Sequence, residues 1–211
     1  MQEVRGFCLY RRRTEPQCFV PDPRSFPPYH QRLKPYIFSE DEVARLLCSA
    51  SGLKRNPLSP LRPEVIRLAI VLLFTTGIRR GELLSLRIGD YDRRESTLHI
   101  QETKFYKSRL LPINASIADE VDRCLRARAR RKLPNSPDTP LIWNAHGGGR
   151  AYTGTGLQRC LGPLLQQCSI FTAQGRVPRI HDARQHADSR IMPNPFQIHR
   201  LEGLGPSFDS A

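Results

Sequence analysis

The feature that most constrains this fold is a long apolar stretch, VIRLAIVLLFTT, at residues 65–76. Apolar residues cover nearly every face of a helix drawn through it, so such a helix has to be surrounded by other elements. Pro63 and Glu64 suit its first turn, and Gly77 is well placed to end it. The longest unbroken apolar run, LAIVLLF at 68–74, is far shorter than the roughly 20 residues that cross a bilayer. The sequence therefore predicts a central core helix and no membrane span.

Shorter helical patterns flank this stretch. FSEDEVARLLCSA offers Ser39 as an N-cap before acidic residues, and GELLSLR predicts a short helix soon after Gly77. SIADEVDRCLRARARRK predicts another helix, with Ser116 and Asp119 as a near capping box at its start and bases at its end. After a glycine-rich loop, a further helix is expected from about residue 154 to residue 167. We therefore expect most of the ordered chain to be helical.

A β pattern is found in STLHIQETKFYKSRLLPI, residues 96–113. Apolar residues alternate at Leu98 and Ile100, and the alternation breaks around Lys104 to Lys107 before apolar residues return. This is typical of a β-hairpin. The sequence thus predicts an α+β fold, mainly helical, with a small antiparallel β-hairpin sheet.

The charge of the chain indicates the class of its partner. There are 33 Lys and Arg against 20 Asp and Glu, a formal net charge of +13. This excess favours a polyanion, because each phosphate that is neutralised releases counterions. Double-stranded DNA is the first candidate and an anionic membrane surface the second. An RNA-binding protein is disfavoured because the chain has no aromatic stacking motif.

The cysteines indicate no disulfide framework. The six cysteines form no C-x-x-C pair, and the chain shows no signal-peptide pattern. We therefore expect reduced thiols in a cytoplasmic protein.

A set of charged residues follows the central helix in a distinctive order. Arg79 stands just past the end of that helix, and Glu82 comes three residues later. About 25 residues on, a lysine lies in the predicted hairpin turn, with PI after the second strand. About 100 residues after Arg79 comes IHDAR, which holds His181 and Arg184. Taken together, these residues resemble the tyrosine recombinase (phage integrase) family over roughly residues 37 to 184.

The resemblance assigns residues to the motifs of that family. Its G-L-R-x-x-E-L box corresponds to Gly77, Ile78, Arg79, Glu82 and Leu83, and its hairpin lysine to Lys104, with Lys107 the less favoured choice. Its H-x-L-R box corresponds to His181, Asp182, Ala183 and Arg184. The resemblance implies a catalytic set of Arg79, Lys104, His181 and Arg184, supported by Glu82 and Asp182, with Arg80, Lys107 and Arg150 as DNA contacts.

The chemistry that the resemblance implies is a transesterification without metal or cofactor. A tyrosine oxygen attacks a DNA phosphate and leaves a 3′-phosphotyrosine and a free 5′-hydroxyl. Arg79 and Arg184 would present forked N–H donors to the five-coordinate phosphorus, and Lys104 would protonate the departing oxygen. His181 would hydrogen-bond the same phosphate, and Glu82 would orient an arginine. The implied partners are double-stranded DNA and further copies of the chain on it.

Each of these residues also has a purely structural interpretation when it is taken alone. Arg79 could cap a helix C-terminus, Lys104 could be a solvated turn residue, and His181 could be a surface histidine. A zinc site built on His181 and His186 is disfavoured, because residues five apart lie on different helix faces and no third ligand is near in sequence.

The sequence departs from the family pattern after Arg184. The tyrosines stand at positions 10, 29, 36, 91, 106 and 152, so none follows the second arginine box, and no nucleophile is assigned. We interpret residues 36–190 as an incomplete catalytic domain and 191–211 as a non-homologous tail. We further expect the reading frame to slip near Arg184 and Gln185, so that the sequence from Gln185 onwards is out of frame. Residues 1–35, which are rich in proline, would be an arm or the remnant of an N-terminal DNA-clamping domain, with a short helix around VRGFCLY.

This departure leaves three functions open. The chain is either a recombinase that is inactive alone, a DNA-binding remnant without catalysis, or a subunit that receives its tyrosine in trans from a partner.

Overall fold

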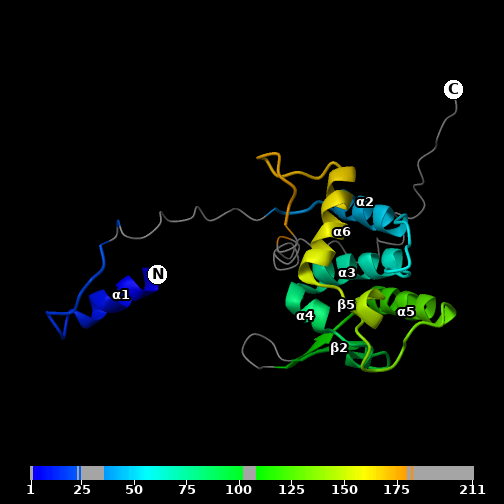
Figure 1. Ribbon diagram of the computed structural model, residues 1–211, viewed down its shortest axis with the longest axis horizontal. Helices are drawn as coiled ribbons and strands as arrows, with labels where there is room; N and C mark the ends of the chain where they lie inside the picture. Colours follow the sequence, from blue (N-terminus) through cyan, green and yellow to red (C-terminus); the bar gives the residue numbers. More distant parts are fainter. Residues whose placement is uncertain (1, 23, 25–35, 102–107, 180–181, 183–211) are drawn as a thin grey trace. The chain divides into compact units, whose positions relative to one another are not determined.

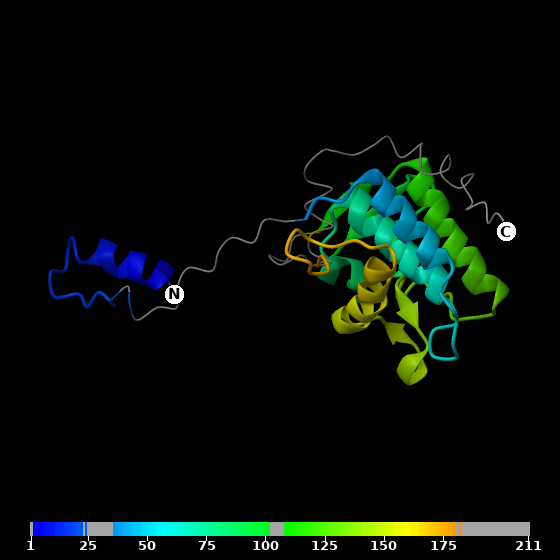
Figure 2. The same cartoon turned by 90° about the horizontal axis from the view of Figure 1, so that it is seen from above.

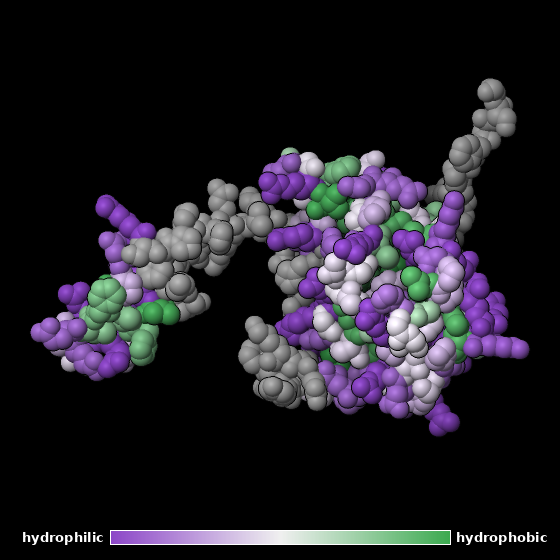
Figure 3. All heavy atoms as spheres, viewed as in Figure 1, coloured by the Kyte–Doolittle hydropathy of each residue, from purple (hydrophilic) through white to green (hydrophobic). Residues whose placement is uncertain are grey.

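The computed structural model describes residues 2–22, 24, 36–101, 108–179 and 182. The chain divides into two compact units, Met1–Lys34 and Pro35–Ala211. The first unit contains helix α1 (Gln2–Arg11), and Arg5 Nε donates a hydrogen bond to the carbonyl oxygen of Pro21 at 3.2 Å. Apolar side chains of this unit, Val4, Phe7 and Leu9 among them, are exposed. Figure 3 shows hydrophobic surface, in green, on this unit.

The second unit is built around helix α3 (Arg62–Thr76), in which Pro63 and every residue from Val65 to Phe74 are buried. Helices α2 (Glu40–Ser51), α4 (Arg80–Ser85), α5 (Ala115–Arg130) and α6 (Gly154–Gln167) pack against it (Figures 1 and 2). The prediction of a central core helix that begins at the proline and ends at Gly77 is thus confirmed. None of the helices in the described ranges is long and apolar enough to cross a membrane.

Two small antiparallel sheets complete this unit. The first has the order β1 (Tyr91–Asp92), β2 (Thr97–Ile100), β3 (Arg109–Pro112), with Leu98 opposite Leu111 and Ile100 opposite Arg109. The second pairs β4 (Trp143–Asn144) with β5 (Arg150–Ala151). Short 3-10 helices occur at Ile88–Asp90 (η2) and His146–Gly148 (η3). The α+β class and the hairpin were predicted from the sequence, whereas β1 and the second sheet were not.

The start of α5 differs from the prediction. The N-cap is Asn114, whose side-chain oxygen accepts a hydrogen bond from the backbone N–H of Ile117 at 3.0 Å. Ser116 lies one residue inside the helix, so the capping box expected from Ser116 and Asp119 is wrong. Asn114 is in an extended conformation and is among the residue types that satisfy first-turn N–H groups best. At α2 the predicted cap is present, because Ser39 and Glu42 form a reciprocal capping box.

One charged pair lies inside the packed helices. Arg67 on α3 donates from Nε to Glu120 Oε1 on α5 at 2.9 Å, and both side chains are less than a tenth exposed. Arg67 Nη1 also reaches the Leu47 carbonyl oxygen and Ser51 Oγ on α2, each at 3.3 Å. A buried charge is tolerated when it is paired and hydrogen-bonded, so Arg67 ties three helices together at one point.

The turn at Gly77 gives a test of this architecture. Gly77 has φ +62°, a left-handed conformation that costs an L-residue about 1–2 kcal/mol. Gly77→Ala is therefore expected to lower the free energy of unfolding by about that amount, measured by chemical denaturation. Gly81→Ala is the matched control, since a Cβ there meets nothing within 4 Å and the position is helical. It should leave stability unchanged or raise it by up to about 1 kcal/mol; equal losses in both variants would contradict this account.

Candidate active site

The end of α3 places Arg79 beside the core. The hydroxyls of Thr75 and Thr76 donate to the carbonyl oxygens of Val71 and Leu72, and Gly77 then turns the chain out of the helix. Ile78 is fully buried, and Arg79 follows it in an extended conformation as the residue before α4. Because its neighbour is held in the core, the backbone of Arg79 has a fixed position.

Glu82, on the first turn of α4, is the centre of the hydrogen bonds at this place. Its Oε1 accepts from Arg79 Nη1 at 2.7 Å, and its Oε2 accepts from the Arg79 backbone N–H at 3.0 Å. Arg109, at the start of β3, donates from Nη2 to Oε2 at 2.9 Å and from Nη1 to Oε1 at 3.3 Å. Glu82 is only 6% exposed, whereas both arginine side chains are 40% exposed. A buried carboxylate thus holds two half-exposed guanidinium groups.

The surroundings of Glu82 keep it ionised. Burial by itself raises the pKa of this carboxyl, but the hydrogen bonds from Arg109 and Arg79 outweigh burial, so the net pKa is lowered. Glu82 therefore remains a charged acceptor at neutral pH and is not a proton donor there.

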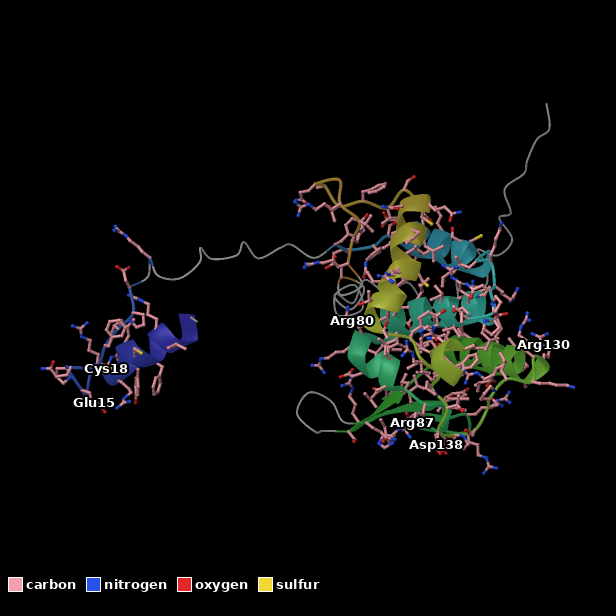
Figure 4. All side chains as sticks on the ribbon, in the orientation of Figure 1. Glu15, Cys18, Arg80, Arg87, Arg130 and Asp138 are labelled. Atoms are coloured by element: carbon pink, nitrogen blue, oxygen red, sulfur yellow. The ribbon has the colours of Figure 1, made fainter. Side chains whose placement is uncertain are left out.

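Two further arginines proposed as DNA contacts are exposed. Arg80 lies on the side of α4 that faces α6 (Figure 4). A Cβ added at Gly154 would lie 3.2 Å from Arg80 Cζ, so the guanidinium packs on the bare backbone at the start of α6. Arg150 stands on β5 with an exposed side chain.

Asp182 has a local structural role. It is 5% exposed, and its Oδ2 accepts a hydrogen bond from the Arg179 backbone N–H at 2.9 Å. The Asp182 N–H in turn donates to the Arg179 carbonyl oxygen at 2.9 Å. Asp182, the second residue of the HDAR segment, is thus held to the backbone of Arg179 by two hydrogen bonds. Lys104, Lys107, His181 and Arg184 lie outside the described residues.

The described tyrosines of the second unit are held in the protonated form. Burial, followed by the hydrogen bond that its hydroxyl donates to Glu42 at 2.6 Å, raises the pKa of Tyr36 to about 12. Burial also raises the pKa of Tyr91, with Asp122 adding to it, and that of Tyr152, although a hydrogen bond with Ser59 opposes the latter. A phenol activated for attack would need the opposite shift. Within the described ranges, no three His, Cys, Asp or Glu side chains gather as metal ligands.

Sequence reasoning missed Arg109. The hairpin pattern showed only that it follows the predicted turn, where a basic residue is ordinarily solvated. The sequence offers one signal, the place of Arg109 in SRLLPI, close to a turn that carries a lysine. Using that signal requires the register of the sheet, because the register decides on which face of the strand Arg109 lies.

The lowered pKa of Glu82 predicts a pH-dependent contribution to stability. The unfolded chain binds more protons than the folded one below about pH 4.3, so this contribution is complete above that pH and is lost as pH falls through the lower folded-state pKa. Glu82→Gln should cost about 1–2 kcal/mol at neutral pH, less than a fully buried pair because the arginines are half exposed. Thermal melts of both chains should converge as the pH falls below about 4.

Glu95→Gln is the control for this measurement, because Glu95 is exposed. Its melting temperature should follow that of the unmodified chain at every pH. A constant difference between the unmodified chain and Glu82→Gln down to pH 3 would contradict the assignment of Glu82 as the ionised acceptor.

Three comparisons identify what this chain is similar to. The model of the phage integrase family matches residues 38–199, a range that extends beyond Arg184. Among curated proteins, y4rB of Sinorhizobium fredii, whose name classes it with integrases and recombinases, is 31% identical over 183 residues, 86% of this chain and 58% of that protein. Tyrosine recombinase XerD of Mycobacterium leprae is 34% identical over 188 residues, 84% of this chain and 52% of its own length.

Solved structures share the fold. XerA recombinase superposes with a TM-score of 0.56 at 22% identity, covering 89% of this chain and 61% of that one. A lambda integrase dimer bound to a core site superposes with a TM-score of 0.58 at 14% identity, covering 91% of this chain and 66% of that one. The chain spans a little over half the length of the curated relatives described. With a family model that covers most of the residues, this chain belongs to the phage integrase family of tyrosine recombinases.

Proposed function

We propose that this chain binds double-stranded DNA and supplies the phosphate-binding part of a tyrosine recombinase active site. The observation that carries the proposal is the arrangement of Arg79: its backbone is fixed by the buried Ile78, and its guanidinium is held by the ionised Glu82. A net charge of +13 supports a polyanionic partner. The structural relatives in complex with DNA, such as the lambda integrase dimer on its core site, support the choice of DNA.

In this proposal Arg79 contributes a preorganised positive charge. When a nucleophile attacks a phosphodiester, negative charge grows on the oxygens of phosphorus, and donors that need no reorganisation stabilise that charge best. Glu82 restricts the rotation of the Arg79 side chain, so the remaining N–H groups of Arg79 point in a limited set of directions. Arg184 would add a second fork, Lys104 would protonate the leaving oxygen, and His181 would hydrogen-bond the phosphate.

The remaining predicted contacts extend this surface. Arg80, Lys107 and Arg150 would contact the DNA backbone, and Asp182 would help to position the segment that carries His181 and Arg184. Residues 36–190 would form the catalytic domain, and several copies of the chain would assemble on DNA.

The described tyrosines favour a second candidate within the same function, in which the attacking tyrosine comes from another subunit. Tyr36, Tyr91 and Tyr152 all have raised pKa values, so none of these three phenols is activated. These raised pKa values favour a role in which this chain binds the phosphate and another subunit supplies the tyrosine.

A nicked duplex that traps phosphotyrosine tests the proposal. We expect salt-dependent DNA binding by this chain and a covalent protein–DNA adduct only after mixing with a recombinase of the family whose own two arginines have been replaced. An adduct with this chain alone would overturn the supply of tyrosine by a partner. Absence of DNA binding at low salt would overturn the whole proposal.

Arg79→Gln tests the role of the guanidinium in the mixed reaction. Loss of one preorganised donor should reduce adduct formation about 100-fold or more, while DNA affinity falls less than about tenfold. Arg55→Gln is the matched control: Arg55 is 44% exposed and also pairs with a glutamate, Glu64, at 2.6 Å. It should change neither quantity. A uniform loss of affinity in Arg79→Gln without a selective loss of adduct would reduce Arg79 to a simple phosphate contact.

A further inference from the structure

Arg109 shares the carboxylate of Glu82 with Arg79. Its two Nη atoms donate to the two oxygens of Glu82, at 3.3 Å and 2.9 Å, in a forked arrangement. Arg79 Nη1 donates to the same Oε1, at 2.7 Å. The two arginines come from separate elements, Arg79 from the start of α4 and Arg109 from β3, so the carboxylate brings together groups that lie 30 positions apart in the chain.

The two guanidinium groups are close enough to act on one anion. The Nη1 atoms of Arg79 and Arg109 contact the same Oε1 at 2.7 Å and 3.3 Å, so they lie within about 6 Å of each other. A charge-assisted N–H···O bond is about 2.8 Å long. Two nitrogens at that separation can each reach a non-bridging oxygen of one phosphate group.

The charge balance also favours an anion. Two positive groups face one carboxylate, so Glu82 offsets one charge and leaves a surplus of one. Both arginine side chains are 40% exposed. In the part of the chain that the structure describes, neither guanidinium has a hydrogen-bond acceptor other than Glu82. A guanidinium has five N–H donors, so each arginine can hold Glu82 with one edge and present another edge to solvent.

We infer that Arg109 is a second phosphate-binding arginine, which faces the same DNA phosphate as Arg79 and is held beside it by Glu82. The inference rests on the proposed function, because it takes the anion to be a DNA phosphodiester. The competing explanation is that Arg109 only fastens strand β3 to α4. The two explanations differ in what they require of Arg109. A phosphate contact requires a positive charge at this position, whereas a link between β3 and α4 requires the two Nη donors of the guanidinium group.

The salt dependence of DNA binding separates these explanations. Log Kd for a short mixed-sequence duplex is measured against log salt for the unmodified chain, Arg109→Gln, Arg109→Lys and the control Arg55→Gln. Each lost phosphate contact lowers the slope by about one. We expect Arg109→Gln to bind about three- to tenfold more weakly with a slope lower by about one. Arg109→Lys should keep the slope, and Arg55→Gln should match the unmodified chain.

Two results would overturn the inference. The first is a slope of log Kd against log salt that Arg79→Gln lowers and Arg109→Gln leaves unchanged. Arg109 would then only link β3 to α4. Equal losses of melting temperature in Arg109→Gln and Arg109→Lys with DNA binding unaltered would lead to the same conclusion. If the unmodified chain does not bind DNA at all, the proposed function fails first, and the two failures are therefore distinguishable.

A measurement on the unmodified chain avoids any loss of folding in the variants. Phenylglyoxal labels exposed guanidinium groups, and mass spectrometry reads the extent of labelling at each arginine. Duplex DNA should protect Arg109 and Arg79 and leave Arg55 labelled as before. Equal labelling of Arg109 with and without DNA, under conditions in which Arg79 is protected, would overturn the inference.

Discussion

The burial of α3 on all sides is the constraint on which the rest of the second unit depends. A helix that is apolar around its whole circumference needs a neighbour on every face, and here α2, α4, α5 and α6 provide them. The one charge that this burial includes, Arg67, is neutralised by Glu120 and so also fixes how α2 and α5 approach. Because the helix cannot shift, its end cannot shift either, and the chain leaves it at a defined point.

That defined point gives Arg79 its position, but a fixed backbone does not fix a long side chain. Arginine has several rotatable bonds, and holding it in one arrangement costs conformational entropy. Glu82 offsets this cost at the site: its buried carboxylate stays ionised and accepts from both the backbone and the guanidinium of Arg79. The energy that keeps the arginine in place therefore comes from within the protein, and no bound anion is needed to order it.

The sequence predicted the parts of this arrangement that depend on local pattern. The long apolar stretch predicted α3, Gly77 predicted its end, and the alternation around Leu98 predicted the hairpin. It did not predict Arg109 as a partner of Glu82, because that contact depends on the register of β3 and on how the sheet meets α4. The predicted N-cap of α5, Ser116, was also wrong, because Asn114 and Ser116 are both residue types that cap well and only the backbone conformation decides between them.

One hydrogen-bonding pattern recurs in the described part of this unit, and the candidate active site contains one example of it. At four places among the described residues, a carboxylate accepts a hydrogen bond from the backbone N–H of the residue three positions earlier. The pairs are Ser39 with Glu42, Arg79 with Glu82, Arg87 with Asp90 and Arg179 with Asp182. The pairs at Ser39, Arg79 and Arg87 each satisfy a donor that a helix start leaves unpaired. At Glu82 the oxygens also accept from two guanidinium groups, so a structural cap becomes the support of a cationic site. What distinguishes this site is therefore not the capping hydrogen bond, which recurs elsewhere in the chain. It is the presence of two arginines, Arg79 and Arg109, that both donate to the carboxylate of Glu82.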